Sequence, residues 1–296
     1  MKKILSALVF LAVLTAPPLL FVQEWHLDVP YVPTKPEVVS KMLEMAHVGK
    51  SDVLYDLGCG DGRIVITAAK RYGTHGVGID INPERIKESR ENAAKEGVTP
   101  LVKFLEQDLF QTDFHDATVV TLYLLSSVNL RLRPVLFAQL MPGTRVVSHD
   151  FAMDGWKPDD SAVVETNGMS HDVYFWIMPA NVSGSWAWTW PEEGKLDPCR
   201  LDLEQHFQTV TGRLNVAGTD FALIDASISG DRIKFSVDRV EPGKTLRVVF
   251  AGRAVRDTID GVMAVRDSGR AAEKPWRVER NPATRKAIDV DAPNLY

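Results

Sequence analysis

The stretch VLYDLGCGDGR, residues 53–63, has the pattern of a buried strand that runs into a glycine turn and then into a helix. Gly58 and Gly60 let the backbone turn sharply and approach a ligand closely, because a Cβ at either position would obstruct it. The helix that follows has unpaired N–H groups at its start. This pattern predicts a loop that binds a nucleotide-containing cofactor, with an ordinary glycine-rich turn of an α/β protein as the alternative.

The spacing of the glycines narrows the choice of cofactor. A dinucleotide-binding loop needs Gly-x-Gly-x-x-Gly, but Arg63 stands where its third glycine would be. Asp61 would repel phosphates at a helix N-terminus, whereas a ligand with an ammonium and a sulfonium group tolerates a carboxylate there. S-adenosylmethionine carries both groups and is the cofactor that we expect.

Acidic residues follow the next predicted strands. Residues 76–80 form a strand that ends in Asp80, 22 positions after the first glycine of the loop, where doubly wound sheets place a carboxylate for ribose hydroxyls. Residues 101–106 form a third strand, and Asp108 after it could accept a hydrogen bond from an adenine amino group. Each acid alone could be a solvated loop residue or a helix cap. Together with Asp56 they predict a ligand site at the carboxyl edge of the sheet.

The α/β alternation continues further along the chain. Residues 117–125 are almost wholly apolar, as expected for a central strand, residues 126–140 form a helix, and residues 144–148 and 172–178 form further strands. We therefore expect an α/β fold with a doubly wound, mostly parallel sheet of the seven-stranded type, similar to that of the class I methyltransferases.

Four segments together resemble a known family: VPYVPT at residues 29–34, the loop DLGCGDGR, the run ATVVTLYLL and the closing PGTRVVSHDF. They are similar to bacterial relatives of the mitochondrial protein-lysine N-methyltransferases that modify the c subunit of ATP synthase and the adenine nucleotide translocator. The resemblance covers residues 29–156, and VPYVPT and TLYLL are its discriminating parts. It implies an S-adenosylmethionine-dependent enzyme that methylates lysine side chains of a protein partner.

The resemblance also implies roles for individual residues. Those expected to contact the cofactor are Tyr31, Thr34, Asp56, Gly58, Gly60, Asp80 and Asp108. Tyr31 and Thr34 would close over it. From composition alone, however, VPYVPT reads as a proline-stiffened linker.

Methyl transfer asks the protein to align a nucleophile with the sulfonium and to exclude water. A lysine amine must also lose a proton from a group with an ordinary pKa of about 10.4. Tyr123 and Asp150, each just after a predicted strand, are the candidate catalytic residues, and His149 is a third. The alternative is that Tyr123 packs its ring and that Asp150 caps the next turn.

The composition of the 296 residues is that of a protein with a proper core, because 45% are apolar. A net charge of −5 means that the chain has no excess of basic residues to neutralise phosphates, so we do not expect nucleic acid as a partner. The two cysteines, Cys59 and Cys199, indicate neither a disulfide framework nor a metal, and we predict no metal site.

The second half changes character, which divides the chain into a methyltransferase domain at residues 29–180 and an antiparallel β domain of unknown role at residues 181–296. Its predicted strands occupy residues 185–190, 207–216, 221–228, 232–237 and 245–255. Trp186, Trp188 and Trp190 would share one face. They either fill the core or hold a protein chain or a membrane surface.

Residues 1–28 resemble a signal peptide or a signal anchor, because Lys2 and Lys3 precede 19 apolar residues at 4–22. We favour an uncleaved anchor, since Pro17 and Pro18 disfavour cleavage, and expect membrane association or export through this segment. The two lysines would place the enzyme outside the cytoplasm. This conflicts with a cofactor made in the cytosol, and the side of the membrane stays open.

Three functions fit these features. The first is a protein-lysine methyltransferase, the second an extracytoplasmic binding or assembly protein that keeps a non-catalytic methyltransferase fold, and the third a small-molecule or lipid methyltransferase. The complete set of glycines and acids favours an enzyme. The methyl acceptor and the oligomeric state stay open.

Overall fold

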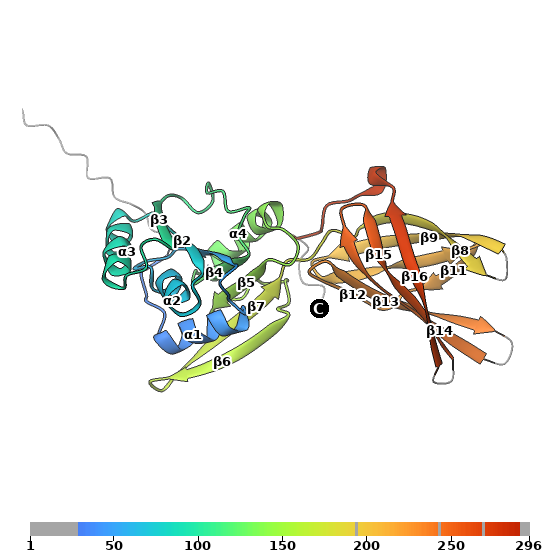
Figure 1. Cartoon of the computed structure of the whole chain (residues 1–296), viewed down its shortest axis with the longest axis horizontal. Helices are drawn as coiled ribbons and strands as arrows, with labels where there is room; N and C mark the ends of the chain where they lie inside the picture. The colour runs from blue at the N-terminus through green and yellow to red at the C-terminus, as the bar shows by residue number, and fades with distance from the viewer. Residues whose placement is uncertain (1–28, 193–194, 242–243, 268–269, 291–296) are drawn as a thin grey trace, which may run out of the picture.

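The computed structural model describes residues 29–192, 195–241, 244–267 and 270–290. The chain forms an α/β unit and then an all-β unit (Figure 1). The apolar segment for which we expect a signal anchor, residues 4–22, lies outside the described residues. Among the helices that are described, none is long and apolar enough to cross a membrane.

The first unit is built on a seven-stranded sheet with the order β3-β2-β1-β4-β5-β7-β6. Five strands are parallel: β1 (Val53–Leu57), β2 (His75–Asp80), β3 (Val102–Glu106), β4 (Val119–Leu122) and β5 (Arg145–His149). β7 (Met169–Ile177) runs antiparallel to β5, and β6 (Asp160–Thr166) pairs antiparallel with β7. The predicted doubly wound, mostly parallel sheet is confirmed.

The structure adds β6 to the strands expected from the sequence. β6 and β7 form a hairpin around Asn167 and Gly168, which have φ angles of 52° and 76°. An Asn-Gly pair with both residues at positive φ is the favoured two-residue hairpin turn, so this dipeptide is the sequence signal for the missed strand.

Within the described part of the chain, four helices flank the sheet: α1 (Pro36–Met45), α2 (Arg63–Tyr72), α3 (Pro83–Lys95) and α4 (Ser126–Gln139). α2 follows Gly62 and stops at Gly73, and both glycines adopt left-handed φ angles. α3 begins where Asn82 caps it by accepting a hydrogen bond from the Glu84 N–H, with Pro83 in the first turn.

The two faces of the sheet bury separate cores. One core packs α1, α2 and α3 against strand residues such as Leu54 and Val147, and the other packs α4 against residues such as Leu122 and Val146. Successive residues of one strand point to opposite faces of the sheet, and helices cover both faces. The central strands are therefore unbroken apolar runs in the sequence.

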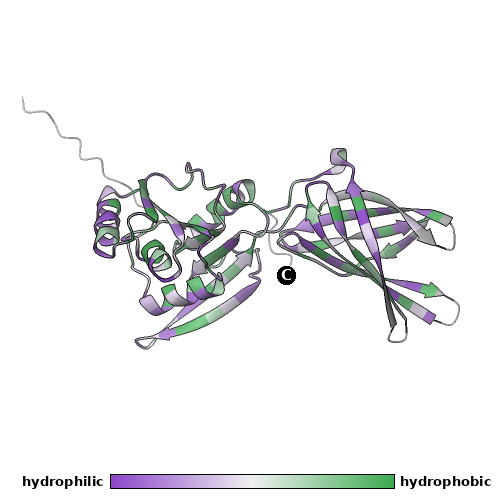
Figure 2. Ribbon diagram, in the orientation of Figure 1, coloured by the Kyte–Doolittle hydropathy of each residue, from purple (hydrophilic) through white to green (hydrophobic). Residues whose placement is uncertain are grey.

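The second unit is an antiparallel sheet with the order β11-β10-β12-β13-β14-β15-β16-β8-β9, and β9 pairs again with β10. Its strands are β8 (Gly184–Glu192), β9 (Lys195–His206), β10 (Thr209–Val216), β11 (Thr219–Ala222), β12 (Ile224–Ser229), β13 (Arg232–Glu241), β14 (Lys244–Val255), β15 (Thr258–Asp267) and β16 (Arg270–Arg280). The predicted antiparallel β domain is confirmed. Polar and apolar residues alternate along its strands (Figure 2).

Details of this domain differ from the expectation. The strand expected at residues 221–228 is divided at Leu223 into β11 and β12, and Asp225, with a φ of 51°, lies within β12 where the pairing with β13 shifts in register. Trp186 and Trp190 are buried, and Trp188 packs against the same core. The core-filling interpretation of these tryptophans is therefore confirmed.

One aromatic residue of the second unit packs on the first. Phe207 stacks on Trp156, with ring centroids 6.0 Å apart and planes 15° apart, and also contacts Phe137 of α4. The guanidinium of Arg133 lies 5.1 Å from the centre of the Phe207 ring. The two units thus share an aromatic cluster at their junction.

Candidate active site

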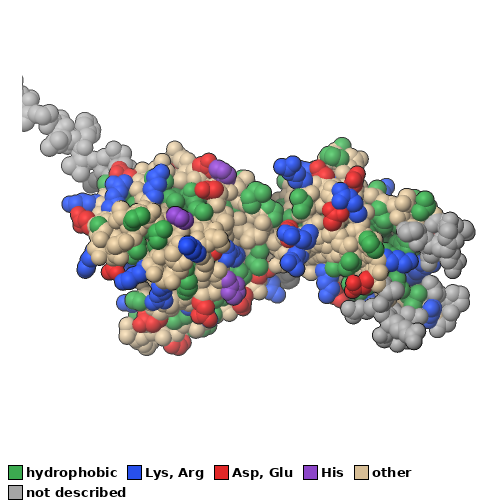
Figure 3. Space-filling view, in the orientation of Figure 1, with side chains coloured by type: hydrophobic (Ala, Val, Ile, Leu, Met, Phe, Trp, Pro, Cys, Tyr) green, Lys and Arg blue, Asp and Glu red, His purple; other side chains and the backbone are tan. Residues whose placement is uncertain are grey.

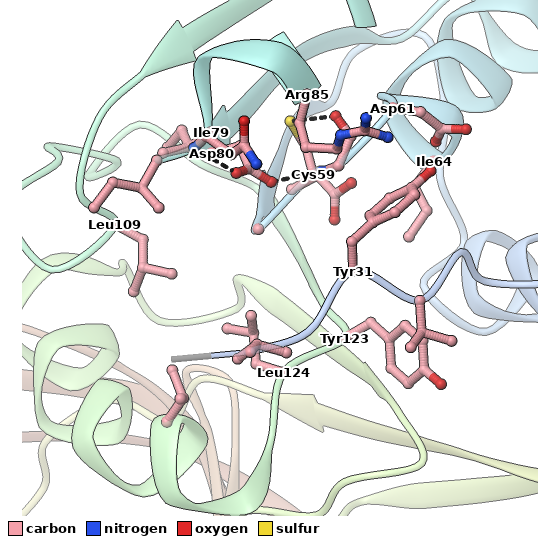
Figure 4. A pocket seen from close by; sticks show the side chains of 18 of the residues that line it. Tyr31, Cys59, Asp61, Ile64, Ile79, Asp80, Arg85, Leu109, Tyr123 and Leu124 are labelled. Carbon is pink, nitrogen blue, oxygen red and sulfur yellow. Dashed lines mark hydrogen bonds between the residues drawn. The ribbon is translucent and has the colours of Figure 1, made fainter. Parts of the chain in front are cut away.

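A pocket opens at the carboxyl edge of the parallel strands (Figure 4). All the residues predicted to contact a cofactor line it: Tyr31, Thr34, Asp56, Gly58, Gly60, Asp80 and Asp108. Tyr123 lines it too. Asp150, the other predicted catalytic residue, is not among the lining residues.

The carboxylate of Asp80 is fixed at the end of β2. One oxygen, Oδ2, accepts a hydrogen bond of 2.9 Å from the Gly60 N–H, and Oδ1 accepts one of 2.9 Å from the Asn82 N–H. These bonds tie the glycine loop after β1 to the loop after β2. The remaining lone pairs of a carboxylate held in this way are available to a ligand in the pocket.

Segment 29–34 lies over the glycine loop. A Cβ at Gly60, whose φ is 52°, would stand only 2.6 Å from the Tyr31 ring. Arg85 also lines the pocket, and its guanidinium lies 4.5 Å from the centre of the Tyr31 ring (Figure 4). A linker would not pack in this way, so VPYVPT is a structured wall of the site.

The charge of Asp61 is balanced within the loop. Arg63 donates to its two oxygens over 2.9 and 2.6 Å, and a further guanidinium nitrogen donates to the Thr34 carbonyl over 2.8 Å. Burial opposes ionisation of Asp61, but the bonds from Arg63 hold its pKa below the ordinary value. Asp61 is therefore not an isolated carboxylate, and through Arg63 it also anchors segment 29–34.

Asp56 is the most buried acid of the pocket, with 2% of its surface exposed. The Thr121 hydroxyl donates a hydrogen bond of 2.7 Å to it. Burial raises the pKa of Asp56 to about 7, and the nearby Asp80 and Asp61 carboxylates add to the shift. A cation beside Asp56 would reverse the effect, because it favours the charged carboxylate.

Tyr123 follows β4 directly and is one of the residues that line the pocket (Figure 4). The predicted strand at residues 117–125 is thus shorter in the structure. The Tyr123 ring lies on His149, with centroids 3.8 Å apart. Burial raises the pKa of Tyr123, so its hydroxyl stays protonated near neutral pH and can orient a partner through a hydrogen bond.

His149 and Asp150 lie behind Tyr123. Burial lowers the pKa of His149 to about 4, which leaves its ring neutral at physiological pH. Asp150 has a φ of 59°, and its Oδ1 accepts a hydrogen bond of 2.9 Å from the Asp172 N–H on β7. The sequence suggested a cap on the following turn, whereas this bond crosses to a neighbouring strand.

His171 is a polar residue of this region that the sequence did not reveal. Its Nδ1 lies 3.1 Å from Oδ2 of Asp150 and 3.0 Å from Nε2 of His149. The antiparallel register of β5 and β7, in which His149 faces Val173, brings these residues together. No local motif could have signalled the contact.

Comparison with known proteins decides the family. The family model described as the ANTKMT methyltransferase domain matches residues 56–160. A protein-lysine N-methyltransferase of Saccharolobus islandicus is 50% identical over 151 residues, which cover 51% of this chain and 94% of that protein. The chain belongs to this methyltransferase family.

Other members of the family are more distant. The Homo sapiens lysine N-methyltransferase of the ATP synthase c subunit is 34% identical over 44% of this chain and 55% of its own length. The adenine nucleotide translocase lysine N-methyltransferase of Mus musculus is 33% identical over 45% of this chain and 58% of its length. The chain therefore spans just over half the length of these two relatives.

A crystal structure from Salinibacter ruber, described as an RNA methyltransferase in complex with S-adenosyl-L-homocysteine, is 57% identical over 49% of this chain and 93% of that chain, with a TM-score of 0.47. The family model itself lies within the α/β unit. Membership in this family confirms the predicted class I methyltransferase and its cofactor, S-adenosylmethionine.

Proposed function

We propose that this chain transfers methyl groups from S-adenosylmethionine to lysine side chains of a protein. The observation that carries the proposal is the 50% identity that extends over 94% of an archaeal protein-lysine N-methyltransferase. The pocket supports it, because the glycine loop and all three strand-end acids line one space. Residues 29–180 also hold more acidic than basic residues, and charges of both signs mingle on the face shown in Figure 3, which favours a protein over a nucleic acid as acceptor.

The fixed geometry suggests how the cofactor lies. Asp80, held by two backbone N–H groups, would accept hydrogen bonds from the ribose hydroxyls. Asp108 on the adjacent strand end would receive the adenine amino group. Gly58 and Gly60 would let the backbone approach the methionine part of the cofactor, while Tyr31 and Thr34 cover it from segment 29–34.

The reaction needs little further chemistry from the protein. The sulfonium is already an activated electrophile, so the site must align the lysine amine with the methyl group and exclude water. The hydroxyl of Tyr123 would orient the lysine amine after the amine has lost its proton. Asp150 lies too far back to line the pocket and would act as a positioning residue through His149, on which Tyr123 stacks.

The test is transfer of a radioactive methyl group. The purified full-length chain is incubated with methyl-labelled S-adenosylmethionine and a bacterial lysate. We expect label that disappears on protease treatment, survives ribonuclease, and appears as methyllysine after hydrolysis. Label removed by ribonuclease, or no label from a protein that binds the cofactor, would contradict the proposal. The Asp80→Ala variant controls for transfer by lysate enzymes.

Cofactor affinity should depend on pH through Asp56. Below its pKa of about 7 the carboxyl is protonated, and a bound sulfonium or ammonium nearby favours the ionised form. Binding therefore releases a proton at pH 6, and affinity should rise by roughly tenfold from pH 6 to pH 8 because the proton is already gone at pH 8. Calorimetric titrations across this range measure the effect. The Asp56→Asn variant should show no such rise; a rise of the same size there would assign it to another group.

A further inference from the structure

A cluster of side chains behind Tyr123 has an arrangement that methyl transfer does not require. His149 and Asp150 extend from the end of β5, and His171 lies on β7. Their inward atoms are Nε2 of His149, Nδ1 of His171 and Oδ2 of Asp150. The three atoms form a triangle with sides of 3.0, 3.1 and 3.2 Å.

Hydrogen bonds alone cannot satisfy this triangle while the carboxylate is ionised. An imidazole nitrogen carries either a proton or a lone pair, so it donates or accepts but never does both. If both histidine nitrogens carry protons, two donors face each other. If only one does, the lone pair of the other faces the carboxylate oxygen. One of the three contacts is therefore repulsive in every such arrangement.

A cation removes the conflict, because it accepts a lone pair from all three atoms at once. We propose that His149, Asp150 and His171 bind one divalent transition-metal ion. Bonds from zinc to nitrogen and oxygen are about 2.0–2.2 Å long. An ion at that distance from each atom sits roughly 1 Å above the plane of the triangle, with neighbouring ligands close to right angles as in a two-histidine, one-carboxylate facial site.

The surroundings hold two of the three ligands, His149 and Asp150, as metal sites require. Metal-bound histidines usually donate their second ring nitrogen to a fixed acceptor. Nδ1 of His149 lies 3.2 Å from the Thr34 hydroxyl, and the second oxygen of Asp150 accepts the Asp172 N–H. His149 is 1% exposed, so its ring has little freedom to turn away.

The donor set determines which ions fit. Two imidazole nitrogens and one carboxylate suit zinc, cobalt, nickel or ferrous iron, whereas magnesium and calcium prefer oxygen ligands. We use Zn²⁺ as the probe and Mg²⁺ as the comparison.

The site also bears on the cofactor pocket. Thr34 contacts His149 through its hydroxyl, and its carbonyl accepts the Arg63 hydrogen bond that anchors segment 29–34. An ion that fixes His149 therefore fixes Thr34 and the wall over the glycine loop. Because coupling between two binding sites is reciprocal, Zn²⁺ should raise cofactor affinity by the same factor as the cofactor raises Zn²⁺ affinity.

The experiment titrates Zn²⁺ into the full-length, tag-free chain after treatment with a chelator, followed by calorimetry. We expect one ion per chain, at least tenfold weaker binding in His171→Gln and in Asp150→Asn, and no comparable binding of Mg²⁺. Asn tolerates the left-handed backbone at position 150, so that variant removes only the charge. Thermal melting checks that each variant is folded.

The matched control is His115→Gln. His115 also contacts a carboxylate, with Nδ1 2.7 Å from Asp113 Oδ1, but this pair is exposed and lies outside the cluster. Zn²⁺ binding should be unchanged in this variant. No stoichiometric binding to the folded chain, or undiminished binding in folded His171→Gln, would overturn the proposal. The absorption spectrum of bound Co²⁺ gives a second readout, and it should be lost with His171.

Discussion

Replacing Asp80 with alanine should weaken S-adenosylmethionine binding at least a hundredfold. In the proposed complex the carboxylate accepts two hydrogen bonds from the ribose, and bonds to charged groups contribute about 1.5–3 kcal/mol each. A loss of about 3 kcal/mol corresponds to more than a hundredfold in affinity. The substitution also removes the acceptor for the Gly60 and Asn82 N–H groups, which loosens the glycine loop. Calorimetric binding to the full-length chain measures the change.

Asp113→Ala is the matched control for this experiment. Its carboxylate is exposed, pairs with His115 and does not line the pocket, so cofactor affinity should stay at the wild-type value. Asp80→Asn, which keeps one carbonyl oxygen, should fall between the two. Wild-type affinity in a folded Asp80→Ala chain would place the ribose elsewhere and remove the basis for the proposed cofactor orientation.

Replacing Tyr123 with phenylalanine should lower kcat about a hundredfold and leave the cofactor Kd unchanged. The ring can still stack on His149, but the hydroxyl that would orient the lysine amine is gone. The loss of one positioned hydrogen-bonding group at a reacting centre typically costs a factor of 10² to 10³ in kcat. Methyl transfer under saturating cofactor and acceptor measures kcat, and calorimetry measures Kd.

Comparing the changes in kcat and in the cofactor Kd of Tyr123→Phe shows what Tyr123 does. A drop in kcat alone assigns Tyr123 to the reacting atoms, whereas an equal loss of cofactor affinity would make it part of the pocket wall. Tyr174→Phe is the control, because its hydroxyl bonds Asp172 and lies outside the pocket lining. An unchanged kcat in Tyr123→Phe would contradict a catalytic role.

The pocket at the carboxyl edge of the parallel strands could be predicted because its signals are local. Gly58 and Gly60 adopt positive φ angles, Asp80 ends β2, and Asp108 follows the end of β3 by two residues. In a parallel sheet the carboxyl ends of successive strands meet at one edge. Residues that follow each strand in the sequence therefore come together in one ligand site.

The parts that the sequence missed depend on distant pairings. His171 meets Asp150 only through the antiparallel register of β5 and β7. β9 and β16 were also missed, because exposed charged residues blur the alternation along them; on β16 these include Glu273, Lys274 and Arg277. Hydrogen-bonded pairing with strands distant in the sequence, rather than local sequence preference, determines where these strands form.

The closure of the second sheet has a consequence for aggregation. Within the described residues, β16 pairs with β8 only through Glu279 and Arg280, so the rest of β16 presents an open edge on that side. Open edges invite pairing with strands of other molecules, and proteins commonly protect them with charges and proline. β16 carries Pro275, which lacks an N–H to donate, next to the charged Lys274. Few backbone pairs thus join β16 to β8, while the strand that borders this opening remains a poor template for self-association.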